Sequence, residues 1–363
     1  MISIHKNIWK RITSWTHYHR TTTLLMISVG VLLGASMVAG VLLYQSPKQI
    51  VNTKTTIKKT PTPAPVVYYS PLSGEKVPDM ASTQQAVTAI MIENSPDARP
   101  QSGIKSAGVV YEAIAEGGIT RFLTLFQQTK PQLVGPVRSV RLYYVDWLAP
   151  FQASVAHVGG SKFALDEVRN GSYRDIDQFF NGGSYWRATD RYAPHNVYTS
   201  FQRLDALNAK KGYTTSTFTP WLRKDGAPSK TPTATKIDIT ISGPLYNSHY
   251  QYDAPSNTYV RSEGGAPHND REAGQLAPSV VIVIDTVMTK IFEDGYREQI
   301  TTSGSGRARI FQDGVVIEGT WSKKDRGSQI IFTDSTGKEI PLDRGQTWIT
   351  AVPANQGGKV TWQ

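Results

Sequence analysis

Residues 108–127, which read GVVYEAIAEGGITRFLTLFQ, carry the clearest secondary-structure signal of the chain. Two apolar runs, at 108–114 and 121–127, flank the turn-forming residues Glu116-Gly117-Gly118. Runs of this length that end near glycines are typical of buried β-strands. We therefore predict two strands joined by a short turn.

The segments on either side of this pair alternate between strand-like and helix-like patterns. Short apolar runs predict strands over 87–92 and 153–158. Helical patterns, two of them followed directly by a glycine, predict helices over 138–148, 161–170 and 200–211. Such alternation is typical of an α/β or α+β fold. We assign residues 69–222 to a mixed α/β first domain.

The part of the chain that follows a polar, proline-containing connection at 223–234 is rich in strand-like segments. Alternating or continuously apolar runs predict strands over 236–242, 245–252, 258–261, 279–286, 307–312, 315–321, 329–333 and 347–352. Turn signals such as Asp313-Gly314 separate these runs. We therefore predict a β-rich second domain over 235–363, built as a small sandwich or barrel.

Residues 24–43 form an uncharged run in which only Ser28 and Ser36 are polar. A helix of about 20 residues spans the roughly 30 Å of a hydrocarbon core. The run is also longer than the about 7–15 residues of a signal-peptide apolar region. We therefore predict a transmembrane helix over 24–44 that serves as an uncleaved signal anchor.

The charges around this run indicate its orientation. Four basic residues precede it and Lys48 follows it, so the positive-inside rule puts the N-terminus in the cytoplasm. The flanking segments then become a cytoplasmic basic segment over 1–23 and a disordered Thr, Lys and Pro-rich linker over 45–68. We expect a single-pass protein of a bacterial cell membrane whose folded part is extracytoplasmic.

The formal net charge of +10 reflects this topology rather than a nucleic-acid partner. Residues 1–60 hold eight of the 39 basic residues and no acidic residue, which leaves 31 basic and 29 acidic side chains in 61–363. A nearly neutral folded part has no bulk attraction for nucleic acid. The sequence contains no cysteine, which excludes disulfides, thiolate catalysis, cysteine-bound metal and a lipid-modified cysteine.

The turn Gly159-Gly160-Ser161 lies between a predicted strand and a predicted helix. Glycines allow a ligand to approach the backbone closely, and the start of a helix favours an anion. Ser161 is then an N-cap or a contact to a carboxylate or another anion. A nucleophilic role has weaker support, because the turn lacks the sequence of a nucleophile elbow.

Two groups of charged residues are candidates for anion binding or for acid/base chemistry. Arg138 and Arg141 lie three residues apart, so on a helix they share a face and can grip one carboxylate or phosphate. The alternative for this pair is a solvated or salt-bridged helix surface. Glu112 and Glu116 can form an acid/base pair, as in glycoside hydrolysis, or ion pairs with Arg121 or Arg138.

The histidines at 157, 195, 249 and 268 do not form a recognised metal-binding spacing. His157 ends an apolar strand, and His195 lies in a polar loop that also carries Asp190 and Arg191. The two histidines with Asp190 can form a metal site or a base with its orienting group, or they can fix the loops through hydrogen bonds. We favour the last interpretation and expect no bound metal and no cofactor.

Several blocks of the sequence resemble the YerB-like family, whose members are described as bacterial lipoproteins. The blocks are IENSPDARPQSG at 92–103, VVYEAIAEGGITRFLTLF, GPVRSVR, AHVGGS and DRYAPHNVYTS, in this order, and FQDGVVIEGTW further along. Together they extend over most of 71–353. The resemblance implies an extracytoplasmic protein with N- and C-terminal domains of unknown function and with no defined catalytic residue. This chain departs from the pattern because it has no cysteine to acylate.

We expect a non-catalytic protein that binds a cell-envelope ligand or acts as a scaffold, and that has no nucleic-acid partner. Polar residues gather where predicted strands end, and α/β sheets bind ligands there. The expected ligand is a cell-wall fragment that bears carboxylate or phosphate. The alternatives are a cell-wall hydrolase that uses Glu112 or Glu116 as acid/base and a protein-interaction module of an envelope complex. The candidate ligand-binding residues are Glu112, Glu116, Arg121, Arg138, Arg141, His157, Gly159, Gly160, Ser161, Asp190, Arg191 and His195.

Overall fold

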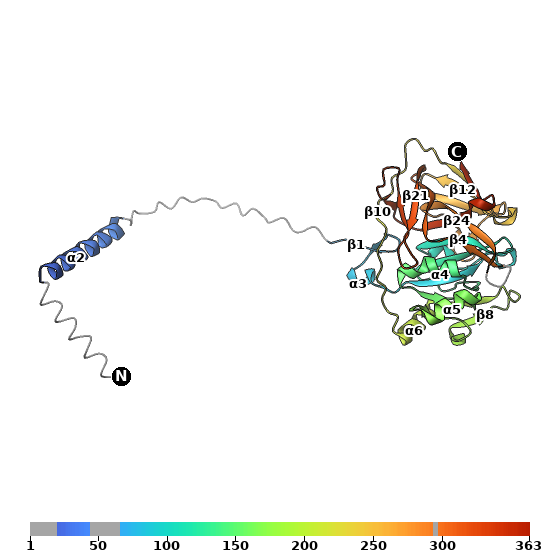
Figure 1. Cartoon of the computed structure of the whole chain (residues 1–363), viewed down its shortest axis with the longest axis horizontal. Coiled ribbons are helices and arrows are strands. Elements are labelled where there is room, and N and C mark those ends of the chain that lie inside the picture. Colours follow the sequence, from blue (N-terminus) through green and yellow to red (C-terminus); the bar gives the residue numbers. More distant parts are fainter. Residues whose placement is uncertain (1–19, 44–65, 293–296) are drawn as a thin grey trace. The chain divides into compact units, whose positions relative to one another are not determined.

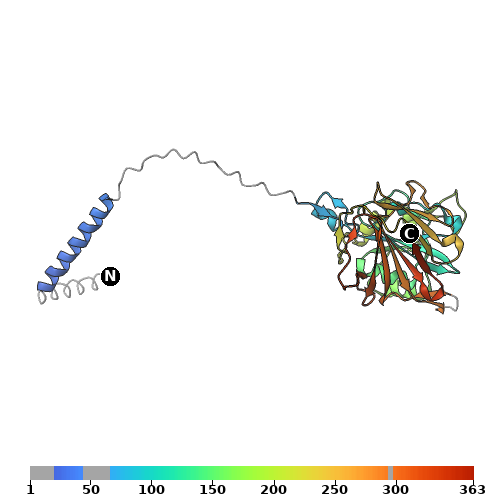
Figure 2. The ribbon, with the colours of Figure 1, turned by 90° about the horizontal axis from the view of Figure 1, so that it is seen from above.

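The computed structural model describes residues 20–43, 66–292 and 297–363. The chain divides into two compact units, Met1–Ala64 and Pro65–Gln363 (Figures 1 and 2). Most of the predicted basic segment 1–23 and most of the predicted linker 45–68 lie outside the described residues.

The first unit contains helix α2, Arg20–Leu43. The Ser36 hydroxyl donates a hydrogen bond of 2.7 Å to the Leu32 carbonyl one turn earlier, so the helix itself satisfies this polar group. A membrane span requires about 20 predominantly apolar residues in a row. Among the residues that the structure describes, no helix is long and apolar enough to cross a membrane. The prediction of a transmembrane signal anchor at 24–44, with its single-pass topology, is therefore wrong.

The second unit has a mixed α/β fold and is built on one ten-stranded sheet. In spatial order the strands are β22 (Ile331–Thr333), β21 (Val315–Lys323), β20 (Gly304–Gln312), β17 (Val280–Thr286), β24 (Thr347–Pro353), β4 (Val109–Glu116), β5 (Ile119–Phe126), β3 (Thr88–Glu93), β6 (Ser154–Ala156) and β7 (Arg174–Asp175). Each of the apolar runs predicted as strands in these regions is confirmed. The sheet therefore combines strands from both parts of the sequence.

The two parts of the sheet meet where β24 pairs with β4. The strands run parallel, with Thr347 opposite Val109 and Thr350 opposite Glu112. In Figure 1 the labels of these two strands lie next to each other in the middle of the folded body. The later strands thus continue the sheet of the earlier ones instead of closing into a sandwich or barrel of their own. The domain boundaries at 222 and 235 stay a prediction.

A second sheet has five antiparallel strands, all from the later part of the chain. In spatial order they are β14 (Ala266–Pro267), β13 (Thr258–Glu263), β12 (Ser248–Asp253), β11 (Lys236–Thr240) and β25 (Lys359–Trp362). In β11, Ile237 and Ile239 are buried while Lys236 and Asp238 are exposed, as the period of two in a strand requires. The two isoleucines join the apolar cluster that contains β17.

Alternate residues of the central strand β3 face two different apolar clusters. Ala89 and Met91 pack in the cluster that includes α4 (Leu142–Leu148) and α5 (Lys162–Asn170). Ile90 packs in the other cluster, which includes α6 (Phe201–Lys211). The sheet is therefore covered on both faces in this region, which explains why residues 89–92 of β3 are all apolar.

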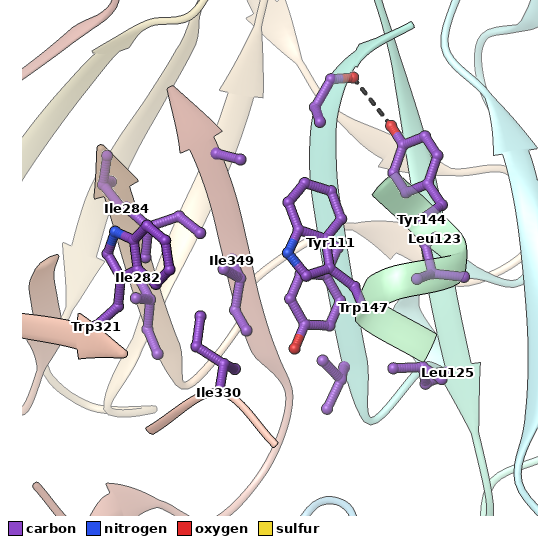
Figure 3. Packing of buried hydrophobic residues seen from close by; sticks show 14 of the residues in the cluster. Tyr111, Leu123, Leu125, Tyr144, Trp147, Ile282, Ile284, Trp321, Ile330 and Ile349 are labelled. Atoms are coloured by element: carbon purple, nitrogen blue, oxygen red, sulfur yellow. Dashed lines mark hydrogen bonds between the residues drawn. The ribbon is translucent and has the colours of Figure 1, made fainter. Parts of the chain in front are cut away.

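The larger cluster crosses the junction between the two parts of the sheet. Figure 3 shows Tyr111 of β4 against Trp147 of α4, and the two rings stack with centroids 5.3 Å apart. Ile349 of β24 and Ile282 of β17 continue the same cluster toward the later strands. The two parts of the chain therefore share one contiguous apolar core.

The predicted helix over 138–148 is wrong in its first turn, because α4 begins only at Leu142. The Arg138 amide donates to the Met91 carbonyl, and the Val158 amide donates to the Arg138 carbonyl. This segment is therefore extended alongside β3, and Arg141 is the residue before the helix. Arg138 and Arg141 do not share a helical face.

The remaining elements are short and lie mostly in connections. They are α3 (Met80–Thr83), β1 (Tyr68–Tyr69), β2 (Lys76–Val77), β8 (Tyr185–Arg187), β9 (Val197–Thr199), β10 (Arg223–Lys224), β15 (Asn269–Asp270), β16 (Gly274–Gln275), β18 (Met288–Phe292), β19 (Arg297–Ile300) and β23 (Leu342–Asp343). Two connections between these elements matter for the site, because the β8–β9 loop and the β15–β16 turn reach the same pocket.

Candidate ligand-binding pocket

Three loops enclose an open polar cavity of about 720 Å³. Loop 94–103 follows the end of β3, loop 188–196 connects β8 to β9, and the turn 271–273 connects β15 to β16. The cavity is within the size range of small-molecule sites. Its lining residues are Asp97, Arg99, Pro100, Asp190, Arg191, Tyr192, Ala193, His195 and Arg271.

Side-chain amides hold the two longer loops in place. Gln101 Nε2 donates to the Glu93 carbonyl at 3.0 Å and to Asn94 Oδ1 at 2.8 Å. Asn196 Nδ2 donates to two carbonyl groups of its own loop, at 3.1 and 3.3 Å. Because these backbone acceptors are satisfied within the protein, the walls of the pocket are fixed before any ligand arrives.

Glu93, the last residue of β3, is a buried carboxylate beside the pocket and only 4% exposed. Its Oε1 lies 3.0 Å from His195 Nδ1, 3.1 Å from Ser95 Oγ and 3.3 Å from Arg138 Nε. Its Oε2 has no hydrogen-bond partner among the described residues. Glu93 thus connects three segments of the chain. It contacts the loop after β3 through Ser95, the extended segment before α4 through Arg138, and the β8–β9 loop through His195.

The contacts of His195 indicate which ring nitrogen carries the proton. Nδ1 faces Glu93, which is only an acceptor when ionised, so Nδ1 carries the hydrogen and donates it. Nε2 then faces the pocket, with Asp97 Oδ2 at 4.0 Å, and the side chain is 22% exposed. The buried carboxylate therefore orients the imidazole and leaves its second nitrogen free for a ligand or a proton.

Arg191 brings to the pocket a guanidinium group that forms no salt bridge among the described residues, although it interacts electrostatically with the neighbouring carboxylate of Asp190. Its Nη1 donates to the Asp97 carbonyl at 3.0 Å and its Nη2 donates to the Pro100 carbonyl at 2.5 Å. Asp190 pairs with Arg271 instead, and Arg191 makes no ion pair in the part of the chain that the structure describes. The two backbone bonds tie loop 188–196 to loop 94–103 and fix the guanidinium at the pocket.

Asp190 and Arg271 close the pocket across the two parts of the chain. Arg271 Nη2 lies 2.6 Å from Asp190 Oδ2, with the side chains 38% and 50% exposed. This hydrogen bond holds the pKa of the Asp190 carboxyl below its ordinary value. The pair is solvent-exposed, so its contribution to stability is small, and it is free to exchange partners when an anion enters.

Arg99 connects the pocket to a charge network in the interior. It donates to Asn94 and lies 3.5 Å from the buried carboxylate of Glu263. Within the network, Arg261 is fully buried and contacts Glu112 Oε1 at 3.0 Å and Glu263 Oε1 at 3.3 Å. Trp348 and Thr350 of β24 donate to the second oxygen of Glu112. Glu112 is therefore a structural ion-pair partner that no ligand reaches.

Glu263 gives this network a dependence on pH. Burial raises the pKa of the Glu263 carboxyl from 4.5 to about 7, against the lowering effect of Arg261. As pH rises above about 4.5 the unfolded chain loses this proton while the folded chain keeps it, so stability decreases between pH 4.5 and about 7. We expect Glu263→Gln to remove this part of the slope in urea unfolding measured across that range. Equal slopes in the two proteins would contradict the assignment.

Glu116 belongs to a different cluster, which is formed with arginine side chains. The side chains of Arg121, Arg141 and Arg297 surround it, and Arg121 Nη2 lies 3.3 Å from its Oε2. Burial raises the pKa of the Glu116 carboxyl, but the guanidinium groups outweigh burial, and the pKa lies below its ordinary value. A carboxylate held ionised by three arginines is unsuited to donate a proton, which argues against Glu116 as a general acid.

The turn at 159–161 is satisfied by the protein itself. Asp177, which is fully buried, accepts from the Gly159 amide at 3.1 Å and pairs with Arg169. Both nitrogens of His157 have acceptors, the Gly159 carbonyl at 2.7 Å and Asp175 at 3.0 Å. An internal carboxylate therefore occupies the position that we expected for an anionic ligand.

Ser161 precedes α5 as its N-cap residue by backbone geometry, but its hydroxyl makes no capping bond. The hydroxyl is buried and lacks a hydrogen-bond partner among the described residues. A Cβ on Gly160 would come within 3.0 Å of Val140 and Leu165, so the turn is packed against apolar side chains. The buried Ser161 hydroxyl is therefore not exposed to solvent at this turn.

The structure thus separates the twelve candidate residues into several groups. Asp190, Arg191 and His195 line the pocket, and Arg138 contacts Glu93 behind it. The other groups are the buried network (Glu112), the arginine cluster (Glu116, Arg121, Arg141) and the Gly-Gly turn (His157, Gly159, Gly160, Ser161). Sequence patterns did not predict the pocket residues Asp97, Arg99 and Arg271 or the adjacent Glu93, although three of the four lie in the block IENSPDARPQSG.

Comparison with known proteins decides the family. The N-terminal and C-terminal domain models of a protein of unknown function, DUF3048, match residues 72–214 and 237–349. A protein of Bacillus subtilis (strain 168) named "Putative lipoprotein YerB" is 35% identical over 289 residues, which cover 78% of this chain and 86% of that protein. The chain belongs to the DUF3048 family. The crystal structure of YerB from Bacillus subtilis resembles this DUF3048 protein with a TM-score of 0.73 and 32% identity, covering 81% of this chain and 99% of the YerB chain.

The pocket is shared between the two DUF3048 segments. Arg271 lies in the segment matched by the C-terminal model, whereas the other lining residues lie in the segment matched by the N-terminal model. Arg99 and Glu263 join the same two segments beneath the pocket. Both DUF3048 segments are therefore needed to form this site.

Proposed function

We propose that this protein binds an anionic ligand of the bacterial cell envelope in the pocket between loops 94–103 and 188–196. The observation that carries the proposal is Arg191, a guanidinium that is fixed by two backbone carbonyls and forms no salt bridge among the described residues. A positioned guanidinium of this kind binds carboxylate or phosphate through charge-assisted hydrogen bonds. The ligand is a cell-wall fragment that bears one of these groups.

The neighbouring side chains support an anion rather than a neutral ligand. Arg271 and Arg99 line the same cavity, and His195 presents Nε2 to it. The lining includes two carboxylates, Asp97 and Asp190, against three guanidinium groups. Net positive charge in a concave site raises the local concentration of anions and speeds their association.

We also propose that the protein acts outside the cytoplasm and in association with the membrane. The support is the relationship to the protein named as a lipoprotein YerB. The sequence contains no cysteine, the residue to which a thioether-linked lipid attaches. An envelope location would bring the pocket into contact with wall polymers, which are rich in phosphate and carboxylate groups.

The proposal predicts that binding depends on the charge of Arg191. In calorimetric titrations of the purified full-length chain, we expect an oligomer of glycerol phosphate or a muramyl dipeptide to bind. Arg191→Gln should weaken that binding by roughly 10- to 100-fold, the value of one charge-assisted hydrogen-bonded contact. Arg191→Lys should keep most of it. The two ligands distinguish a phosphate source from a carboxylate source, and affinity should decrease with added salt.

Arg307→Gln is the control, because it removes the charge of another surface arginine, one that pairs with Glu318 and lies outside the pocket. Its affinity for the same ligand should equal that of the wild type. The proposal fails if neither ligand binds at millimolar concentration, or if the Arg191 and Arg307 variants lose affinity equally.

A further inference from the structure

We propose that His195 acts as a general base in the pocket and that the protein hydrolyses a phosphodiester bound there. The inference rests on the proposed anion binding and adds a reaction to it. What points to it is the juxtaposition, at one open cavity, of a buried carboxylate, an imidazole oriented by that carboxylate, and a guanidinium that forms no salt bridge among the described residues.

The Glu93–His195 pair has the geometry of a base held by its orienting group. Glu93 Oε1 accepts from His195 Nδ1 at 3.0 Å, which leaves the lone pair of Nε2 directed to the cavity. Ser95 Oγ lies 3.1 Å from the same carboxylate oxygen and donates to it. Ser95 is buried and faces Nδ1 rather than Nε2, so it supports Glu93 and is not positioned as a nucleophile.

The loop that carries His195 is held so that the ring keeps its direction. The His195 amide donates to the Tyr192 carbonyl at 2.9 Å, and Arg187 Nη1 donates to Asn196 Oδ1 at 2.7 Å. Arg191 ties the same loop to the Asp97 and Pro100 carbonyls. Preorganisation of this kind lowers the cost of reaching the reactive geometry.

A phosphodiester fits this arrangement better than a remote carboxylate does. In a phosphodiester the anionic group that Arg191 holds is also the scissile group, so binding the anion brings phosphorus next to His195. If Arg191 instead held a carboxylate of the ligand, the position of the scissile bond relative to His195 would not be defined. Nonbridging oxygens also gain charge during attack on phosphorus, and the guanidinium groups of Arg191 and Arg271 stabilise that charge.

The reaction uses water as the second reactant. His195 Nε2 removes a proton from a water molecule as the water oxygen forms a bond to phosphorus. The bond from phosphorus to one alcohol oxygen breaks on the opposite side of phosphorus, that oxygen takes a proton from solvent water, and the His195 imidazolium gives its proton to solvent. The products are a phosphomonoester and an alcohol, and His195 returns to its neutral form. General-base catalysis of this type contributes roughly 10²–10⁴-fold to the rate.

The test is release of p-nitrophenolate from bis(p-nitrophenyl) phosphate by the full-length chain. We expect His195→Asn to lower kcat by about 100-fold or more while KM changes little. The asparagine amide can still donate to Glu93 from the place of Nδ1, which keeps the loop folded, and His195→Gln serves as a second variant. His249→Asn is the matched control, since His249 also pairs with a carboxylate, Asp238 at 2.8 Å, but is exposed and outside the pocket.

The catalytic inference is overturned if the wild type releases p-nitrophenolate no faster than the two His195 variants do. If titration with inorganic phosphate still shows binding that requires Arg191, the proposed function survives that result. If the wild type does not bind phosphate, both the proposed function and the catalytic inference are overturned. A His249→Asn protein as impaired as His195→Asn would also overturn the role of His195.

Discussion

Replacing Arg261 by methionine is expected to lower the free energy of unfolding of the full chain by about 3–5 kcal/mol. Arg261 is fully buried and is the cation shared by Glu112 and Glu263. It also donates to Tyr250 and His268. Removing it leaves two buried carboxyl groups without their positive partner, and each must then keep a proton or stay uncompensated in a medium of low dielectric constant.

Urea unfolding at neutral pH measures this effect. Arg307→Met is the control, because the Arg307–Glu318 pair is more than half exposed on both sides and should contribute at most about 1 kcal/mol. Adding Glu112→Gln to Arg261→Met should recover part of the loss, since one of the two unpaired carboxyl groups disappears. A loss of less than about 1 kcal/mol in the single variant would contradict the buried network.

Replacing Trp348 by alanine is expected to cost about 3–5 kcal/mol as well, through the cavity left in the core. Trp348 is fully buried on β24 at the junction of the two parts of the sheet. Its ring packs edge-on against Phe122, with centroids 5.3 Å apart, and its Nε1 donates to Glu112 at 2.9 Å. Trp348→Phe should cost less, about 1–2 kcal/mol, because it loses mainly the hydrogen bond.

Thermal unfolding of the Trp348 variants also tests whether the two parts of the chain fold together. Because Trp348 contacts strand β5 of the earlier part from strand β24 of the later part, we expect one transition that moves to lower temperature. Two transitions, of which only one moves, would show that the parts unfold separately. Trp186→Ala is the control, since Trp186 is only partly buried, against Arg203 at the surface.

Local patterns in the sequence predicted most strands but not how the strands of the two parts join. The runs at 279–286 and 347–352 are apolar enough to require burial on both faces, and both are confirmed as strands. The second run, β24, pairs with β4, which connects residues more than 200 positions apart, and no local pattern records such a contact. The prediction of a separate sandwich or barrel failed for this reason.

The predicted transmembrane helix and the predicted helical turn at Arg138 failed for different reasons. At 24–44 the sequence suggested a span, whereas no helix among the described residues is long and apolar enough to be one. At Arg138 the backbone hydrogen bonds to Met91 and Val158 outweigh local helical preference, because pairing beside β3 satisfies the same backbone groups.

The pocket was only half predictable. A polar loop with Asp190, Arg191 and His195 is informative by itself, since loops carry such residues mainly for a contact or a ligand. Glu93 gave no such signal, because it is the last residue of an apolar strand and its role appears only when loop 188–196 folds against it. Arg271 comes from a distant turn, so only the fold brings it to the pocket.

Nuclear magnetic resonance of the Arg191 and His195 side chains tests anion binding in this pocket most directly. The full-length chain is labelled with ¹⁵N in arginine and histidine, and Arg191→Lys and His195→Asn assign the two signals. On titration with inorganic phosphate, we expect saturable shifts of the Arg191 Nε and His195 Nε2 signals while the His249 signals stay unchanged. Saturable phosphate binding that leaves both pocket signals in place, or no binding at all, would contradict it.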